Sequence, residues 1–415
     1  MTAASKLAIN GGPKAKTTPY GTGKRFAGNE LKYLTDALEQ NTLFYGSGKW
    51  VKRACEMMQE YLSVPYVVAC TSGSAAVHLG VVAAGIAPGD EVILTPNTDS
   101  GSALGIIEEG AVPIFCDCEW TLQPSARTVA EKITDRTRAV VVVHLAGHPA
   151  PVDEILELCR PRGIAVIEDC AQSWGTRLHG KRVGSFSAAG CFSINDFKHI
   201  STGDGGFVAL SDEALYRRVH NYADKHYDRF FKTELLQAHH GMCYRMSELL
   251  GAVACAQLER VEQITSRQHD IGESLRQQLS GLVGARVLQP IAGGYATYWW
   301  TALFVEPEAL TASRDEIVKA LQAEGLPLSS YGKYDLIEKT LFQKRHVRSW
   351  LSGPLATYPF DQPDGRSYHY SIDQTPIHKK ALETGMMVGI STFWTDQDIA
   401  EIAAGIRKVF AAYAR

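Results

Sequence analysis

The sequence predicts an α/β protein: a large domain with a seven-stranded, mostly parallel sheet in an α/β/α sandwich, followed by a smaller C-terminal α/β domain. Two observations predict this fold. Seven short apolar runs precede position 211, and most are continuous rather than alternating with polar residues. Helical segments separate most of these runs. Continuous apolar runs are typical of strands that are buried on both faces, as in parallel sheets.

The predicted strands and helices of the large domain follow one another as expected for a layered α/β domain. The strands are expected at 66–71, 91–96, 112–117, 139–144, 165–169, 190–194 and 206–210, and helices at 29–39, 50–61, 75–84 and 152–160. In such sheets, ligands bind at the carboxyl ends of the strands. Five residues with polar side chains fall at or just past those ends: Ser72, Asp99, His144, Asp169 and Lys198.

We expect four parts along the chain. An irregular N-terminal arm covers 1–27, where Gly-Gly-Pro and Pro-Tyr-Gly clusters indicate turns, and the large domain covers 28–245. A linking helical region with a break covers 246–284, because its apolar residues recur at near-helical spacing. The small domain covers 285–415, with a strand-like run at 295–305 and helices at 314–324 and 396–412.

Composition excludes several classes of protein. The chain has 415 residues, 45% hydrophobic and 21% charged, which is enough for a large core and a second domain. Its net charge of −3 provides no basis for binding nucleic acid or an anionic membrane. We find no apolar run of membrane-spanning length and no signal-peptide core. Nine cysteines without a CxxC pair predict reduced thiols in a cytoplasmic protein.

The stretch 167–206 carries the chemistry. A strand ends in Glu168 and Asp169, and a second strand leads to Lys198, ahead of a Gly-rich turn. A buried carboxylate and an amine at neighbouring strand ends suit pyridoxal 5'-phosphate (PLP): the carboxylate keeps the pyridine nitrogen protonated, and the amine forms the Schiff base. Alternatively, Lys198 is a solvated loop lysine and Asp169 a strand-end cap, since most residues of both types lie at surfaces.

A Ser-Gly-Ser turn follows the first predicted strand. Ser72, Gly73 and Ser74 stand between that strand and the helix expected at 75–84. Unpaired backbone N–H groups and the helix dipole favour an anion at such a position. Alone, the turn equally fits an ordinary helix N-cap.

Three linked motifs resemble the DegT/DnrJ/EryC1/StrS family of sugar aminotransferases, which are PLP enzymes of fold type I. The family's E-D-x-A-Q-S-x-G reads EDCAQSWG at 168–175, its F-S-F-x-x-x-K reads FSINDFK at 192–198, and its G-x-G-G reads GDGG at 203–206. The resemblance implies that Lys198 holds PLP and Asp169 contacts its ring nitrogen. It further implies that Gln172 packs beside the ring, and that the phosphate is bound by Gly73, Ser74 and Ser193.

Two positions depart from the family pattern. Asp99 stands where the family has an aromatic ring that stacks on the cofactor. Either Asp99 contacts a substrate hydroxyl or alters proton transfer, or the alignment is shifted by one residue, or another ring such as Trp174 or Phe44 covers the cofactor. Cys243 replaces an Asn in the family's G-x-N-x-R-M motif.

The segment around Cys243 also concerns assembly. In the family it reaches the phosphate site of the neighbouring subunit, so the resemblance implies a homodimer with shared active sites. Cys243 and Arg245 are then cofactor-binding residues of the partner's site, with Arg245 as an anion partner. Alternatively, Arg245 forms a salt bridge at a helix start.

The polar segment 220–241 contains four histidines, His220, His226, His239 and His240. Their spacing matches no metal-ligand pattern. We expect the segment to be a mobile loop near the mouth of the active site. His144 begins an HLxG turn that the family shares; either it is structural or it contacts PLP. We therefore expect no metal.

The resemblance implies a PLP-dependent aminotransferase that moves an amino group from glutamate or glutamine to a keto sugar or keto-cyclitol. We place it in amino-sugar or antibiotic biosynthesis. Relatives that dehydrate or deoxygenate sugars have His where this chain has Lys198, which favours transamination. The alternatives are a PLP-dependent dehydratase or oxidase on a related substrate, and a non-catalytic PLP-binding regulator.

Overall fold

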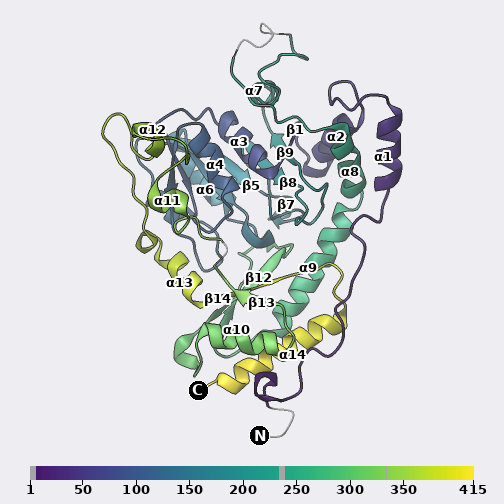
Figure 1. Cartoon of the computed structure of the whole chain (residues 1–415), viewed down its shortest axis with the longest axis vertical. Helices are drawn as coiled ribbons and strands as arrows, with labels where there is room; N and C mark the ends of the chain where they lie inside the picture. The colour runs from purple at the N-terminus through teal and green to yellow at the C-terminus, as the bar shows by residue number, and fades with distance from the viewer. Residues whose placement is uncertain (1–5, 233–238, 333) are drawn as a thin grey trace.

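A seven-stranded sheet forms the centre of the upper half of the molecule in the computed structural model, which describes residues 6–232, 239–332 and 334–415 (Figure 1). The strand order is β1-β9-β8-β5-β4-β2-β3. The strands are β1 (Tyr66–Cys70), β2 (Glu91–Leu94), β3 (Val112–Phe115), β4 (Thr137–Val143), β5 (Ala165–Asp169), β8 (Ala189–Ser193) and β9 (Gly206–Leu210). These are the seven predicted strands, with ends that differ by one or two residues.

The sheet is mostly parallel, as predicted. Pairings among β8, β5, β4, β2 and β3 are parallel, while β9 runs antiparallel to both β8 and β1. Every residue of β2, β8 and β9 is buried. The continuous apolar runs therefore have the physical cause inferred from the sequence, since helices cover both faces.

Helices cover the sheet on its two faces. On one face α3 (Gly73–Ala83) packs on β8 and β9, with α4 (Gly101–Glu108) and α7 (Glu213–Ala223) beside it. On the other, α2 (Trp50–Leu62) contacts β1 and β9, and α6 (Val152–Cys159) contacts β5. Helices α1 (Glu30–Glu39), α5 (Ala126–Ala130) and α8 (Glu248–Leu258) also lie in this half.

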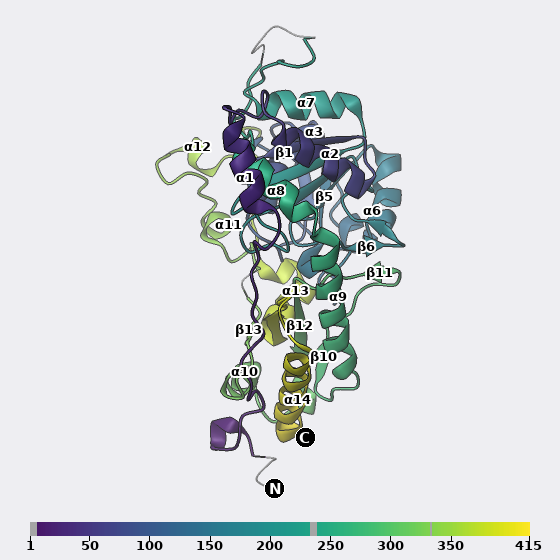
Figure 2. The same cartoon turned by 90° about the vertical axis from the view of Figure 1, so that its right-hand side faces the viewer.

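A second sheet lies in the lower half, with order β10-β12-β14-β13. Its strands are β10 (Ala285–Val287), β12 (Trp300–Val305), β13 (Leu328–Ser330) and β14 (Gly385–Gly389). Helix α9 (Val261–Gln278) runs from the upper half into the lower one, where α10 (Arg314–Ala323) and α14 (Asp396–Tyr413) also lie (Figure 2). The predicted break in the linking region is the gap between α8 and α9. A small third sheet joins β11 (Gly294–Tyr295) to β6 (Arg177–Leu178) and β7 (Lys181–Arg182).

The segment between β13 and β14 returns to the upper half, where it carries α11 (Thr340–Lys344) and α12 (Pro354–Thr357) (Figure 1). Helix α13 (Pro376–Thr384) then leads back to the lower sheet, where it contacts β12 and β14. Phe342 packs edge-on against Phe115 of β3, with ring centroids 5.0 Å apart, and Phe360 packs on Phe342 at 5.8 Å. These aromatic residues therefore belong to the large core. The domain boundaries that we drew from the sequence remain predictions.

The N-terminal arm is tied to the last helix. Lys16 is buried, and its Nζ lies 2.8 Å from Asp398 and 2.8 Å from Glu401 of α14. The ammonium group of Lys16 lowers the pKa of Glu401 to about 2. The arm is thus held by residues nearly four hundred positions further along the chain. Its own sequence indicated only turns and gave no sign of this contact. Its first five residues lie outside the described part.

The predicted loop over 220–241 lies partly outside the described residues, since 233–238 are not among them. His220 belongs to α7, and its ring packs edge-on against Phe230 at 5.0 Å. Within the described ranges, no helix has the length and apolar character to cross a membrane.

Candidate active site

A cavity of about 450 Å³ opens at the carboxyl ends of the parallel strands. Seven of the nine predicted site residues line it: Gly73, Ser74, Asp99, Asp169, Gln172, Ser193 and Lys198. They come from five separate stretches of chain between 72 and 198. The fold therefore brings the three motifs into one site.

Lys198 lies in the turn that follows β8, three residues after Asn195. Its backbone N–H donates to the carbonyl of Asn195 at 2.9 Å. Its Nζ lies 4.2 Å from the ring centroid of Trp299, close enough for a cation–π contact. The amine is thus held at the cavity wall by an aromatic face from the residue before β12.

Asp169 ends β5 and faces the cavity from the opposite side. Its Oδ2 accepts from Ser102 Oγ at 2.7 Å, and its Oδ1 accepts from the backbone N–H of Ala171 at 3.0 Å. Burial raises the pKa of Asp169, although Ser102, Ala171 and the charge of Lys198 favour the ionised form. A buried carboxylate of this kind gains stability when a cation is placed against it.

The helix start at α3 forms the other end of the cavity. Ser72 is the N-cap, and its side chain accepts from Ala75 N–H at 3.1 Å. The first N–H groups of the helix have no intrahelical acceptor, so those of Gly73 and Ser74 are available to an anion. A Cβ on Gly73 would lie only 2.5 Å from the Cβ of Ser193. Glycine is therefore required for this close approach of helix and strand.

Gln172 is buried and fixed by its neighbours. Its Oε1 accepts from the backbone N–H of Ala146 at 3.0 Å and from Trp300 Nε1 at 3.3 Å. Both contacts hold the amide at the cavity wall. Its place beside a cofactor ring stays a prediction.

Asp99 does line the cavity, but neither ring suggested as a substitute for the missing aromatic does. Trp174 is wholly buried and donates from Nε1 to the carbonyl of Ser193 at 2.8 Å. Phe44 lies beside Tyr45, with ring centroids 4.9 Å apart. The rings of Phe197, Trp299 and Tyr334 line the cavity instead.

Tyr334 is held in place by a second aromatic ring. It stacks on Trp300 with centroids 5.6 Å apart and an interplanar angle of 5°. Burial raises the pKa of its hydroxyl, and the negative charge of Asp99 adds to this rise. Together Asp99 and Tyr334 make one wall that can present a carboxylate and a phenol to a hydroxylated ligand.

Cys243 and Arg245 do not line the Lys198 cavity of their own chain. Arg245 donates from Nη1 to Asp224 Oδ1 at 2.9 Å, and it lines a separate cavity with Tyr45. Cys243 is exposed and forms an isolated β-bridge with Asp224. A salt bridge was one of the two alternatives for Arg245; a role in a partner's site remains a prediction.

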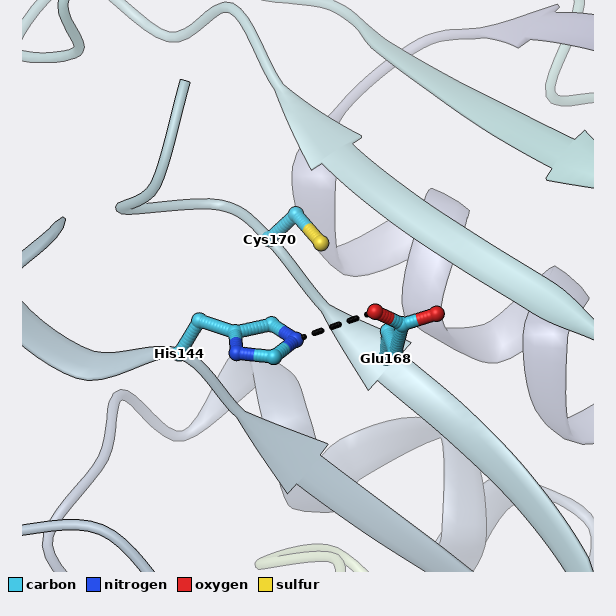
Figure 3. A group of neighbouring side chains, drawn as sticks. All are labelled: His144, Glu168 and Cys170. Carbon is cyan, nitrogen blue, oxygen red and sulfur yellow. Dashed lines mark hydrogen bonds and ion pairs between the residues drawn. The ribbon is translucent and has the colours of Figure 1, made fainter. Parts of the chain in front are cut away.

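His144, Glu168 and Cys170 form a buried cluster, with one polar atom of each lying within 4.8 Å of the others (Figure 3). His144 Nε2 lies 3.2 Å from Glu168 Oε2, and His144 Nδ1 accepts from Ala150 N–H at 3.0 Å. Burial raises the pKa of the Cys170 thiol well above its usual range. Both imidazole nitrogens of His144 are thus engaged by neighbouring protein groups. These contacts are what the structural alternative for His144 predicts, and its role stays a prediction.

Several lining residues were not found from the sequence. Ser102, Trp299 and Tyr334 lie in the cavity, and only Ser102 is near a predicted site residue in the chain. Trp299 and Tyr334 come from more than one hundred residues beyond Lys198. Both belong to aromatic-rich stretches, but nothing in their local pattern separates a cavity wall from a core position.

Comparison with known proteins gives a single family. The model of the "DegT/DnrJ/EryC1/StrS aminotransferase family" matches residues 25–351. GDP-perosamine synthase of Vibrio cholerae is 33% identical over 344 residues, which cover 80% of this chain and 92% of the relative. A Streptoalloteichus tenebrarius protein provisionally named L-glutamine:3-amino-2,3-dideoxy-scyllo-inosose aminotransferase is 30% identical over 98% of both chains.

Solved structures agree on the fold. An aminotransferase from Psychrobacter cryohalolentis matches with a TM-score of 0.81 and 24% identity, over 96% of this chain and 100% of the other. The aminotransferase TlmJ from Streptoalloteichus hindustanus matches with a TM-score of 0.77 and 25% identity, over 96% and 99%. The chain therefore belongs to the DegT/DnrJ/EryC1/StrS aminotransferase family.

Proposed function

We propose that this sugar or cyclitol aminotransferase binds PLP in the cavity at Lys198 and uses glutamate or glutamine as its amino donor. The observation that carries the proposal is the meeting of three groups in one cavity: the helix start at Gly73, the buried carboxylate of Asp169 and the amine of Lys198. Each matches one chemical part of PLP, namely its phosphate, its ring nitrogen and its aldehyde.

The residues fit this cofactor on independent grounds. A phosphate suits the unpaired N–H groups at Gly73 and Ser74, where the absence of a Cβ admits close approach. A protonated pyridine nitrogen would supply the cation that the buried Asp169 lacks, and so would lower a pKa that burial raises. Ser193 Oγ and Gln172 would complete the contacts. When bound, PLP supplies an electron sink that stabilises negative charge at the reacting carbon.

The chain's own groups then have distinct tasks. Lys198 would hold the cofactor through its amine, and the same Nζ, when free, would serve as the base that moves a proton between the substrate carbon and the cofactor. Asp169 keeps a proton on the ring nitrogen throughout. Asp99 and Tyr334 line the wall facing this region and are placed to orient hydroxyl groups of the acceptor.

The acceptor class follows from the relatives. Proteins named GDP-perosamine synthase and scyllo-inosose aminotransferase support a keto sugar or keto-cyclitol as the acceptor here. We further propose a homodimer in which Cys243 and Arg245 approach the partner's phosphate site. Support comes from the position of Arg245 outside the Lys198 cavity of its own chain. It also comes from exposed apolar side chains: Leu31 and Leu38 on α1, which packs against α8, and Phe44, whose ring centroid lies 5.6 Å from the Arg245 guanidinium.

The test is the absorbance spectrum of the purified protein with PLP, before and after adding glutamate or glutamine. We expect a yellow protein that either donor converts to the colourless, amino form of the cofactor. The Lys198→Ala variant should lose the visible band and fall in turnover by roughly 10³-fold or more, whereas the exposed Lys181→Ala should keep both.

Two results would contradict the proposal. A protein that cannot be reconstituted with PLP excludes this cofactor. A yellow protein that neither donor converts excludes these donors and favours the dehydratase or oxidase alternative.

A further inference from the structure

The turn that carries Lys198 is held from outside the large sheet by two side chains. Its three consecutive carbonyls, those of residues 196–198, all accept hydrogen bonds from distant parts of the chain. The guanidinium of Arg25 donates from Nη1 to the carbonyl of Asp196 and from Nη2 to that of Lys198. Trp299 donates from Nε1 to the carbonyl of Phe197 at 2.8 Å.

Trp299 contacts the turn twice. Besides its hydrogen bond to the Phe197 carbonyl, its ring faces the Lys198 amine, with Nζ 4.2 Å from the centroid. An aromatic face attracts an ammonium ion and not a neutral amine, and the carboxylate of Asp169 acts on the same charge. One side chain therefore influences both the position and the protonation of the amine.

Arg25 is itself fixed in place. Its backbone carbonyl accepts from Arg260 Nη2 at 2.8 Å and from Gln257 Nε2 at 3.3 Å. Both of these side chains also donate to Glu30 Oε1, each at 2.6 Å. The arm is thus fastened to α1, α8 and the start of α9 beside the point where Arg25 reaches the turn.

The turn is held locally by hydrogen bonds more than by packing. Phe197, at its tip, is 76% exposed, so packing restrains it little. Lys198 N–H donates to the carbonyl of Asn195 at 2.9 Å, and Asp196 N–H donates to that of Gly203 at 3.0 Å. Phe197 N–H donates to Asn195 Oδ1 and Ser201 Oγ donates to Asp196 Oδ1, each at 3.3 Å. A displacement of about 1 Å at a reacting group is enough to cost on the order of 10²-fold in rate.

We propose that Arg25 and Trp299 are positioning residues, which hold the Lys198 turn so that its amine stays at the reacting carbon. This inference rests on the proposed role of Lys198. It adds that the N-terminal arm, together with the residue that precedes β12, completes the active site. The planar fork of arginine matters here, because one guanidinium spans two carbonyls that a lysine ammonium cannot engage in the same way.

The first test compares Arg25→Met and Arg25→Lys with Lys24→Met, which removes a neighbouring positive charge from the arm. We expect both Arg25 variants to fold and bind PLP, and to lose roughly 10- to 100-fold in kcat with little change in KM for the donor. Lys24→Met should keep the wild-type kcat. A wild-type kcat in Arg25→Lys, or a loss of kcat in Lys24→Met as large as that in Arg25→Met, would overturn the proposal for Arg25. Either result would show that the positive charge matters and not the hydrogen bonds of the guanidinium.

The second test measures the pH dependence of the rate at which the apoprotein captures PLP, which requires unprotonated Lys198. Loss of the ring in Trp299→Leu should lower the midpoint by about one pH unit, from the size of a cation–π contact. Trp299→Phe keeps an aromatic ring and should shift the midpoint by less. Its kcat should still fall, because phenylalanine cannot donate the hydrogen bond to the Phe197 carbonyl. The exposed Trp350→Phe is the control.

Wild-type midpoints and wild-type kcat in both Trp299 variants would overturn the proposal for Trp299. Failure of the proposed function is distinguishable from these outcomes. It would appear as a Lys198→Ala protein that keeps the visible band and turnover, whatever the Arg25 and Trp299 variants do.

Discussion

Replacement of Glu168 by glutamine should destabilise the protein strongly, although it changes one atom. Its Oε1 accepts from Phe186 N–H, Ser187 N–H and Ser187 Oγ, each at 2.9 Å. Its Oε2 accepts from Gly184 N–H at 2.6 Å and His144 Nε2 at 3.2 Å. Every partner is a donor, which only a carboxylate satisfies on both sides.

The magnitude follows from the two donors that lose an acceptor. An amide keeps one oxygen for the donors on its side and places an NH₂ group against Gly184 and His144. Each buried donor left without an acceptor costs about 1–3 kcal/mol. The expected loss in the free energy of unfolding is therefore about 2–6 kcal/mol. His144 cannot compensate by changing tautomer, because its Nδ1 already accepts from Ala150.

The pH dependence carries a definite sign. Burial alone would raise the pKa of Glu168, but its hydrogen bonds, led by that from His144, hold it below the usual range. A lowered pKa means that the carboxylate stabilises the fold fully above its unfolded pKa of about 4.3. This contribution disappears as the pH falls through the folded value. The difference in the free energy of unfolding between the wild type and Glu168→Gln should thus become smaller below about pH 4.

Urea unfolding followed by circular dichroism and tryptophan fluorescence measures the effect. The exposed Glu157 of α6 provides the matched control, and Glu157→Gln should leave the midpoint unchanged. A loss below about 1 kcal/mol in Glu168→Gln, or a gap that does not change with pH, would refute the reasoning.

Two further substitutions test other parts of the structure. Gly73→Ala places a Cβ 2.5 Å from that of Ser193; such overpacking costs about 1–3 kcal/mol, so we expect PLP affinity, measured by titration of the apoprotein, to fall roughly 10- to 100-fold. Lys16→Met leaves two carboxylates of α14 without their buried cation, and should lower the free energy of unfolding by about 3–5 kcal/mol, measured in urea.

Each of these two has a control on the same chain. A Cβ on Gly389 would meet nothing within 4 Å, so Gly389→Ala should bind PLP as the wild type does. Lys14 is exposed, and Lys14→Met should unfold at the wild-type urea concentration. Wild-type affinity in Gly73→Ala would show that helix and strand can separate, and wild-type stability in Lys16→Met would show that Asp398 and Glu401 do not depend on the lysine.

The parts of the fold that could be predicted from the sequence are those with a local signal. Strands such as β4 and β9 are buried on both faces, so their apolar character continues without interruption along the chain. The site residues Asp169 and Lys198 could be found because each follows such a strand, and because strand ends meet at one edge of the sheet. Gly73 is assigned to the phosphate through the family resemblance, because a Ser-Gly-Ser turn alone also fits an ordinary helix N-cap.

The residues that escaped prediction act across long sequence separations. Arg25 touches the Lys198 turn through two hydrogen bonds, yet its own neighbourhood shows only turn residues. Lys16 looks like any surface lysine until α14 lies against it. Trp174 shows the opposite error: it stands inside a motif, but its ring packs in the core, because residue type alone does not reveal which side of a loop a side chain occupies.

The arm has a consequence for the order in which the protein forms during synthesis. Asp398 and Glu401, which anchor Lys16, leave the ribosome long after Gln257 and Arg260, which hold Arg25. Domains form as units while the chain grows, so Arg25 can reach the Lys198 turn before the other end of the arm has its anchor. The arm therefore settles from its Arg25 end toward Lys16, whose contacts wait for α14.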